Sequence, residues 1–182
     1  MLIPGSCNVL IADISFQSVG ETYVASGVRQ IKRLVDAAAI VSVPVIVALY
    51  PPSVEIGTLA TTAVLDADLP RLPFRPSPLD WSYSPLGRAI AATGRNQIII
   101  AGLWLEEAVT LLALNCLAVG FDTYVAGDAT AMIDTASETA AQARLTQAGA
   151  VPTSTEQVIR EWAALQESAE QSAELAACLQ RS

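Results

Sequence analysis

Histidine is absent from this chain of 182 residues, and lysine occurs only once, as Lys32. Without histidine there is no Ser-His-Asp or Cys-His catalysis, no histidine-ligated zinc and no histidine general base. Any chemistry must therefore use carboxylates, arginines, hydroxyls or the backbone.

Charge is also scarce. Charged residues make up 15% of the chain, and 10 basic against 18 acidic residues give a net charge of −8. This balance argues against binding to nucleic acid or to an anionic membrane surface. No apolar run reaches the ~18 residues of a membrane span, and the N-terminal stretch MLIPGSCNVLIAD lacks the basic region of a signal peptide. We therefore expect a cytoplasmic protein with no nucleic-acid or membrane partner.

Cysteine is rare and dispersed, as Cys7, Cys116 and Cys178, with no CxxC pair. This spacing is typical of neither a disulfide framework nor a zinc site. We expect no metal and no cofactor.

Hydrophobic residues, in contrast, make up 52% of the chain. Short β-branched runs alternate with longer helical patterns, which is typical of a parallel sheet with helices on both faces. The strands are expected near 8–14, 44–49, 97–101, 121–126 and 150–151, and the main helices at 21–41, 106–119 and 135–148. A short helix is expected to begin with Ser84 as N-cap and Pro85 at its first position, and to end at Gly94. The prediction is one α/β domain over residues 1–182, with three α/β/α layers, a mainly parallel sheet of about six strands and a Rossmann-like arrangement.

Two segments stand apart from this alternation. Residues 51–83 are rich in proline, and Pro76 and Pro78 exclude a regular helix there. We expect an irregular excursion with one short strand near 72–75. The tail, residues 154–182, is expected to form one or two helices with an apolar stripe, formed by Val158, Trp162, Leu165, Ala169, Ala176 and Leu179. That stripe is either an ordinary docking face or a subunit interface.

Ligands of open parallel α/β sheets bind outside the carboxyl ends of the strands. The residues to inspect are therefore Asp13, Tyr50, residues 102–108 and Asp128. Asp13 has two readings: it contacts a ligand, or it caps a loop or pairs with Arg75. Arg75 in turn is either a loop ion-pair partner or a clamp for a carboxylate.

The run RNQIIIAGLWLEEAVTLLALNCLAVGFDTYVAGDAT, residues 95–130, is similar to the most characteristic stretch of the isochorismatase-like cysteine hydrolases. LIADISFQ resembles the first strand of that family, and GAVPTSTEQVIREW its closing strand and helix. The resemblance covers about residues 8–165, and within the family it points to the YcaC-type branch. It implies the isochorismatase-like hydrolase fold, hydrolysis of small amides or vinyl ethers, and homo-oligomers from dimers to octamers.

The family's chemistry needs a cysteine activated at a helix N-terminus, an aspartate and a lysine. It also needs backbone N–H groups that form an oxyanion hole after an unusual cis peptide. By resemblance, Asp13 matches the aspartate, Leu103-Trp104 the unusual peptide, and Ala108 the position of the cysteine.

The remaining family positions also depart from the pattern. Leu105 takes the place of the family's threonine, and the lysine position falls on Phe74 or, with a slip of one residue, on Arg75. Arg75 is then a possible stand-in for the lysine. The chain's own cysteines cannot replace the nucleophile, since Cys7 lies about 20 Å from Asp13 along its strand and Cys116 about 12 Å from Ala108 along its helix.

Several of these residues also have a plain structural reading. Glu106, which matches a frequent family glutamate, and Glu107 suit the dipole at a helix N-terminus. Trp81 and Trp104 are either pocket walls, with Leu103 and Leu105, or core residues. Asp128 is expected to order a loop through its own hydrogen bonds.

Two hypotheses of function follow. The first is a pseudoenzyme, a family member without cysteine-dependent hydrolysis that binds a small molecule or serves assembly. The second is an active hydrolase of a small amide-like or vinyl-ether substrate, in which Asp13 is the general base for water. A third possibility is that Ala108 is an introduced substitution of a native cysteine. That change alone would not explain why the family's threonine and lysine are missing as well.

Overall fold

The computed structural model describes residues 1–14, 21–50, 65, 68–132 and 135–180. It contains one six-stranded sheet in which every neighbouring pair of strands is parallel, in the order β3-β2-β1-β4-β5-β6. The strands are β1 (Cys7–Ile14), β2 (Val45–Tyr50), β3 (Arg71–Pro73), β4 (Gln97–Gly102), β5 (Asp122–Thr130) and β6 (Val151–Thr153).

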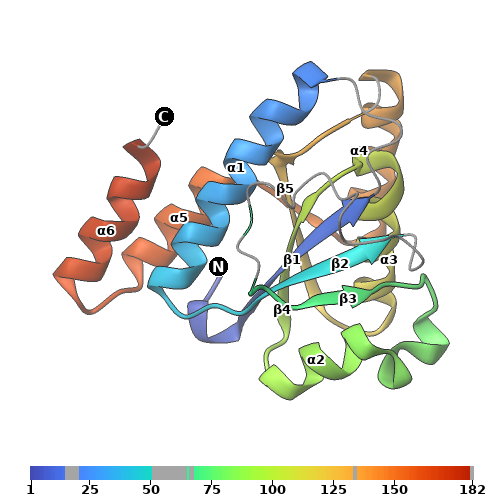
Figure 1. The fold of residues 1–182 in the computed structure, drawn as a ribbon, viewed down its shortest axis with the longest axis horizontal. Coiled ribbons are helices and arrows are strands. Elements are labelled where there is room, and N and C mark those ends of the chain that lie inside the picture. Colours follow the sequence, from blue (N-terminus) through green and yellow to red (C-terminus); the bar gives the residue numbers. More distant parts are fainter. Residues whose placement is uncertain (15–20, 51–64, 66–67, 133–134, 181–182) are drawn as a thin grey trace.

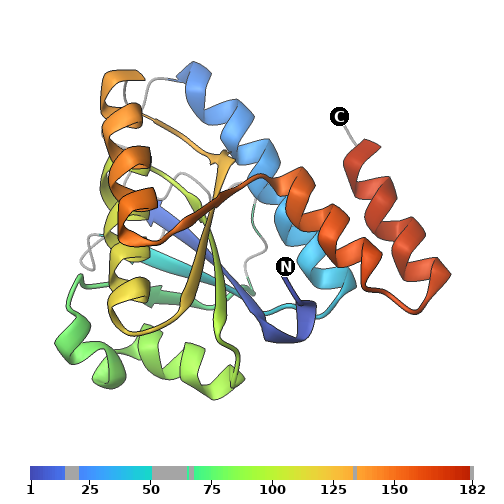
Figure 2. The ribbon, with the colours of Figure 1, turned by 180° about the vertical axis from the view of Figure 1, so that it is seen from behind.

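Helices cover both faces of this sheet (Figures 1 and 2). One layer consists of α1 (Glu21–Ile40), α5 (Thr155–Ala164) and α6 (Ala169–Gln180). The other contains the short helix η4 (Pro78–Tyr83), α2 (Pro85–Thr93), α3 (Thr110–Ala118) and α4 (Thr135–Ala148). This arrangement confirms the predicted three-layer α/β fold, including its six strands.

The central strands are apolar on both sides because each side faces a layer of helices. Alternate residues of β1 lie in two separate hydrophobic clusters, with Leu10 in one and Val9 and Ile11 in the other. Every residue of β4 is buried. Within the described residues, no helix is long and apolar enough to cross a lipid bilayer.

The sequence located α2 well. Ser84 is its N-cap and accepts a hydrogen bond from the Gly87 N–H at 2.9 Å, Pro85 occupies the first turn, and Gly94 ends the helix in the left-handed conformation. In the proline-rich excursion, β3 lies where a short strand was expected and η4 is a 3-10 helix. The part of that excursion at residues 51–64 and 66–67 lies outside the described residues.

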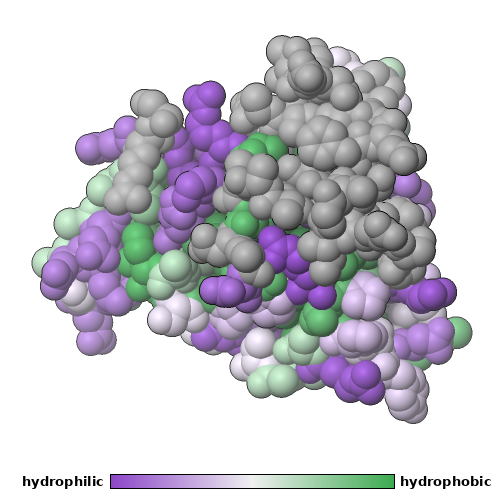
Figure 3. Space-filling view, in the orientation of Figure 1, coloured by the Kyte–Doolittle hydropathy of each residue, from purple (hydrophilic) through white to green (hydrophobic). Residues whose placement is uncertain are grey.

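The stripe expected along the tail is correct in α5 and only partly correct in α6, where Leu179 packs against the core but Ala169 and Ala176 are exposed. Val158 and Trp162 are fully buried, whereas Leu165 is 40% exposed. In α6 the buried residues are Leu175 and Cys178, because the turn at residues 165–168 separates the two helices and changes which side of α6 faces α1 and α5. The buried faces of the tail therefore pack within this chain. Its outer surface mixes hydrophilic and hydrophobic residues in the view of Figure 3.

Candidate functional site

The direction in which successive strands are added to the sheet reverses between β1 and β4. From β1 the chain builds outward through β2 and β3, and it then returns to the other side of β1 as β4. In an open α/β sheet with this order, the helices diverge at such a switch point and leave a crevice at the carboxyl ends of the two strands. Asp13, the penultimate residue of β1, and Gly102, the last residue of β4, lie there.

Gly102 brings the two strand ends unusually close. Its φ is +123°, which side chains rarely tolerate, and a Cβ at this position would lie 2.0 Å from the carbonyl oxygen of Ala12. The next residue, Leu103, donates its N–H to that same oxygen at 2.9 Å. The peptide bond between Leu103 and Trp104 is cis, at the position where the family resemblance placed it.

The turn after the cis peptide is tied to β5 as well. Leu105 donates its N–H to the carbonyl of Ala131 at 2.8 Å, and Ala131 donates its own to the carbonyl of Gly102 at 3.3 Å. The turn is thus held from both sides by backbone bonds. The sequence missed Ala131, since no residue type was needed for a contact made only by the backbone.

The helix that follows begins differently from the prediction. Residues Leu105–Val109 form a π-helical turn, η5, in which the Val109 N–H donates to the Trp104 carbonyl at 3.1 Å. The Thr110 hydroxyl donates to the Leu105 carbonyl. The predicted helix at 106–119 is therefore the wide turn η5 followed by α3, and π-turns within helices are frequent at functional sites.

Ala108 lies in η5 and is completely buried. Residues of one hydrophobic cluster surround this part of the fold, and they include five other positions singled out from the sequence: Phe74, Trp81, Leu103, Trp104 and Leu105. The Nε1 atom of Trp104 is buried, and none of the described residues forms a hydrogen bond with it. The tertiary structure thus gathers the expected pocket residues into an apolar environment.

Asp13 is also fully buried, and it pairs in register with Leu49 of β2. Phe74 lies two strands away, where its N–H donates to the Leu49 carbonyl at 2.9 Å and its ring packs against Tyr50 at 6.0 Å between centroids. Its neighbour Arg75 is exposed and lines a surface hollow with Asp80. Of the two positions matched to the family lysine, one is therefore a buried aromatic and the other faces solvent.

The remaining candidates take structural positions. Trp81 is 6% exposed, and its ring packs edge-on against Phe121 at 6.1 Å between centroids. Glu106 and Glu107 lie in the first turn after β4, as expected for residues that favour a helix dipole.

The interpretation of Asp128 as a residue that orders a loop is corrected, because β5 continues through it to Thr130. Its carboxylate instead accepts hydrogen bonds from the backbone N–H and hydroxyl of Thr155, at 2.8 and 3.2 Å. Asp128 thus joins the strand to the start of α5.

Burial also determines the chemistry of two thiols. Desolvation raises the pKa of Cys116 from 9.0 to about 12 and, as the largest of several influences, that of Cys7 to about 11. A reactive cysteine requires the opposite shift, since the thiolate is the nucleophile. Neither thiol resembles an activated nucleophile.

Comparison with known proteins identifies a family and a fold that agree with the sheet and the turn described above. The isochorismatase domain matches residues 20–157. Probable hydrolase YcaC of Escherichia coli K12 is 37% identical over 89 residues, which are 47% of this chain and 43% of that protein. The matched part thus spans less than half the length of this curated relative.

Solved structures extend the likeness to nearly the whole chain. YcaC from Pseudomonas aeruginosa, with hexane-2,5-diol and covalent acrylamide, has a TM-score of 0.75 at 22% identity, over 97% of this chain and 90% of that one. The octameric YcaC hydrolase of Escherichia coli gives 0.72 at 23%, over 97% and 89%. MAR1 ribonuclease of Caenorhabditis elegans gives 0.77 at 21%, over 100% and 93%. These three proteins share the fold of this chain. Because the isochorismatase domain matches most of the residues of this chain, the chain belongs to the isochorismatase-like hydrolase family.

Proposed function

We propose that this family member lacks cysteine-dependent hydrolysis and acts as a pseudoenzyme that binds a small molecule or serves assembly. The observation that carries the proposal is Ala108, which occupies the buried turn after the cis peptide and has no nucleophilic atom. A methyl group there cannot form the covalent intermediate on which the cysteine chemistry depends.

The surroundings support the same conclusion. Lys32 is the only lysine of the chain, and it lies on α1, where it pairs with Asp36 at 2.9 Å. Position 74 holds a buried phenylalanine, and the Arg75 side chain is exposed. Of the two positions where the family resemblance places the lysine, one thus carries no charge, and the other carries an arginine whose side chain faces solvent.

Acrylamide provides a direct test, because the Pseudomonas aeruginosa neighbour carries it covalently. We expect the native chain at neutral pH to remain unmodified by acrylamide and by iodoacetamide, as measured by intact mass. It should also show no turnover of nicotinamide, other small amides or isochorismate. Rapid addition of one adduct to the folded protein would contradict the proposal, and peptide mapping would identify the thiol.

The second candidate function is hydrolysis without a cysteine, with Asp13 as the general base for a water molecule. The observation in its favour is the position of Asp13, fully buried at the switch point where ligands of this fold bind. The test measures turnover of the same substrates by the native chain and by the variants Asp13→Ala and Asp13→Asn. Saturable turnover that both variants abolish would establish this function and refute the pseudoenzyme.

We further propose that the protein is a cytoplasmic homo-oligomer, between a dimer and an octamer. One structural neighbour is octameric. In this chain Leu79 is 92% exposed and Tyr83 79% exposed, both on η4 in the proline-rich excursion. A contiguous exposed apolar patch marks an interaction site, and these two side chains, four residues apart on one short helix, are the candidates for its centre. The tail, residues 154–182, is the alternative contact.

A further inference from the structure

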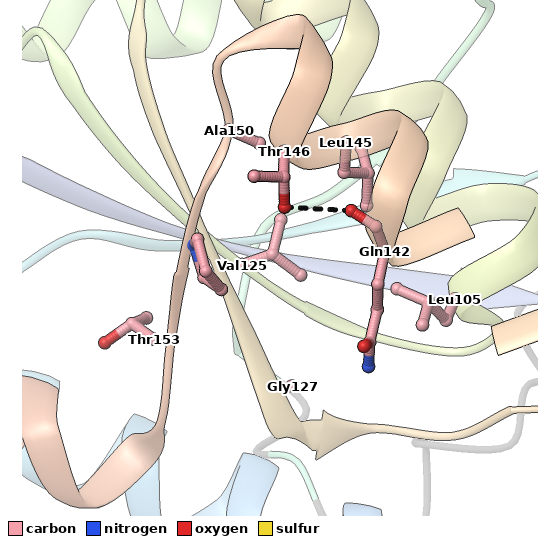
Figure 4. A pocket seen from close by; sticks show the side chains of 9 residues that line it. Leu105, Val125, Gly127, Gln142, Leu145, Thr146, Ala150 and Thr153 are labelled. Carbon is pink, nitrogen blue, oxygen red and sulfur yellow. Dashed lines mark hydrogen bonds between the residues drawn. The ribbon is translucent and has the colours of Figure 1, made fainter. Parts of the chain in front are cut away.

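A hollow lies between η5, α4 and the strands β5 and β6 (Figure 4). Its volume is about 280 Å³, and it is lined by Leu105, Val125, Gly127, Gln142, Leu145, Thr146, Ala150, Pro152 and Thr153. Pockets for drug-sized ligands are typically about 300–1,000 Å³. The size therefore suits a molecule of one or two rings.

The lining is apolar at the bottom and polar at the opening. Leu105, Val125, Leu145 and Ala150 are nearly fully buried. Gln142 and Thr146 are exposed side chains of α4 that face the same opening in Figure 4. All of the lining residues are uncharged. Because a charged ligand would lose hydration without gaining a counter-charge, the lining favours a neutral ligand.

The hydrogen bonds at the opening determine which polar group is available. The Thr146 hydroxyl donates to the backbone carbonyl of Gln142 at 2.9 Å. The Gln142 side-chain Nε2 donates to the Glu138 carboxylate at 2.8 Å, which fixes the orientation of the amide. Among the described residues, none donates a hydrogen bond to Oε1 of Gln142. The hollow thus offers an acceptor and calls for a ligand with an N–H or O–H donor.

A second copy of this chain is a poorer occupant. The edge strand β6 contains Pro152, which has no N–H to donate to an added strand. The remaining lining is concave rather than flat.

We propose that this hollow binds a neutral aromatic molecule of one or two rings that carries a single N–H or O–H donor. The rings lie on Leu105, Val125 and Leu145, and the donor bonds to Oε1 of Gln142. Neither Asp13 nor Ala108 lines this hollow, although Leu105 of the η5 turn forms part of its wall.

Indole is the probe, and 1-methylindole is its matched control because methylation removes the donor but keeps the rings. Both are titrated into the full-length protein labelled at leucine and valine methyl groups. We expect saturable shifts at Leu105, Val125 and Leu145 with indole, and affinity at least about 5-fold weaker for 1-methylindole, as for the loss of one hydrogen bond.

Gln142→Ala should weaken indole binding by a similar factor and leave 1-methylindole unchanged. Gln147→Ala, on the same helix but outside the hollow, should bind both probes like the native protein. Shifts located elsewhere, equal binding of the two probes, or no shifts at these three methyl-bearing residues would overturn the proposal. None of these outcomes depends on whether the protein hydrolyses anything.

Discussion

The Gly102 backbone passes so close to Ala12 that a Cβ on Gly102 would lie 2.0 Å from the Ala12 carbonyl oxygen. This contact joins the ends of β1 and β4, where Ala12 pairs with Gly102, and the cis peptide follows directly after it. The geometry of the turn before Ala108 therefore depends on a residue without a side chain.

Gly102→Ala should be strongly destabilising. The positive φ costs an alanine about 1–2 kcal/mol, and the clash with backbone atoms adds to it, so we expect a loss of more than about 2 kcal/mol in the free energy of unfolding. Gly94→Ala is the matched control, since Gly94 also has a positive φ but open space around it. Urea unfolding of both variants measures the difference, and equal losses would show that the close approach is unimportant.

Ala108→Cys should restore neither labelling by acrylamide nor turnover of amides. The introduced thiol would lie among buried apolar side chains, which raise the pKa of a cysteine as they do for Cys116. The measurement is the rate of adduct formation at neutral pH, with peptide mapping to separate position 108 from the native cysteines. Fast labelling of the cysteine at position 108 would contradict this prediction. It would mean that the turn still activates a thiol and that the chain lacks only the cysteine side chain.

Cys116 should make the protein less stable at alkaline pH. Its folded pKa, about 12, lies above the ordinary value of 9.0. Both states keep the proton below pH 9, but at higher pH only the unfolded state loses it, so the free energy of unfolding falls as pH rises from 9 towards 12. At about pH 10.5 this amounts to about 2 kcal/mol. Urea unfolding at pH 7.5 and 10.5 should show a smaller decline for Cys116→Ala than for the native chain, and parallel declines would contradict this origin.

Glu161 should hold the N-terminal segment on α5. Its carboxylate accepts the Leu2 N–H at 2.6 Å, and the Leu2 side chain is 1% exposed. Glu161→Ala removes a charge-assisted bond and should cost about 1.5–3 kcal/mol of unfolding free energy. Glu156→Ala on the same helix breaks only an exposed pair with Arg160, which contributes about 0.5 kcal/mol or less. Thermal unfolding compares the two, and equal shifts in Tm would refute the role of Glu161.

Self-association should depend on η4. The double change Leu79→Ser and Tyr83→Ser removes two exposed apolar side chains and should lower the molar mass measured by light scattering. Leu165→Ser, at the 40% exposed residue of the tail, tests the alternative contact. A native chain that is monomeric would contradict the proposed oligomer, and dissociation only by Leu165→Ser would assign the contact to the tail.

Local patterns predicted the elements that depend on local interactions. The Ser84-Pro85 start and Gly94 end of α2 follow from capping preferences, and the buried strands follow from continuous apolar runs. The stripe across the tail failed for Ala169 and Ala176 of α6, because a periodic pattern carried through the turn at 165–168 does not determine how a second helix rotates against α1. Likewise, the sequence predicts that β5 ends before Asp128, because it does not show that the Asp128 carboxylate accepts a hydrogen bond from Thr155.

For the site, the sequence by itself determined which atoms are present: no histidine, one lysine, and alanine at position 108. Only the tertiary structure decided where those residues lie. It buried Asp13 and Ala108 at the switch point, left Arg75 exposed, and formed a neutral hollow from residues that no local pattern connects. The physical reason is that chemical identity belongs to single residues, whereas burial, desolvation and close backbone contacts depend on segments far apart in the chain.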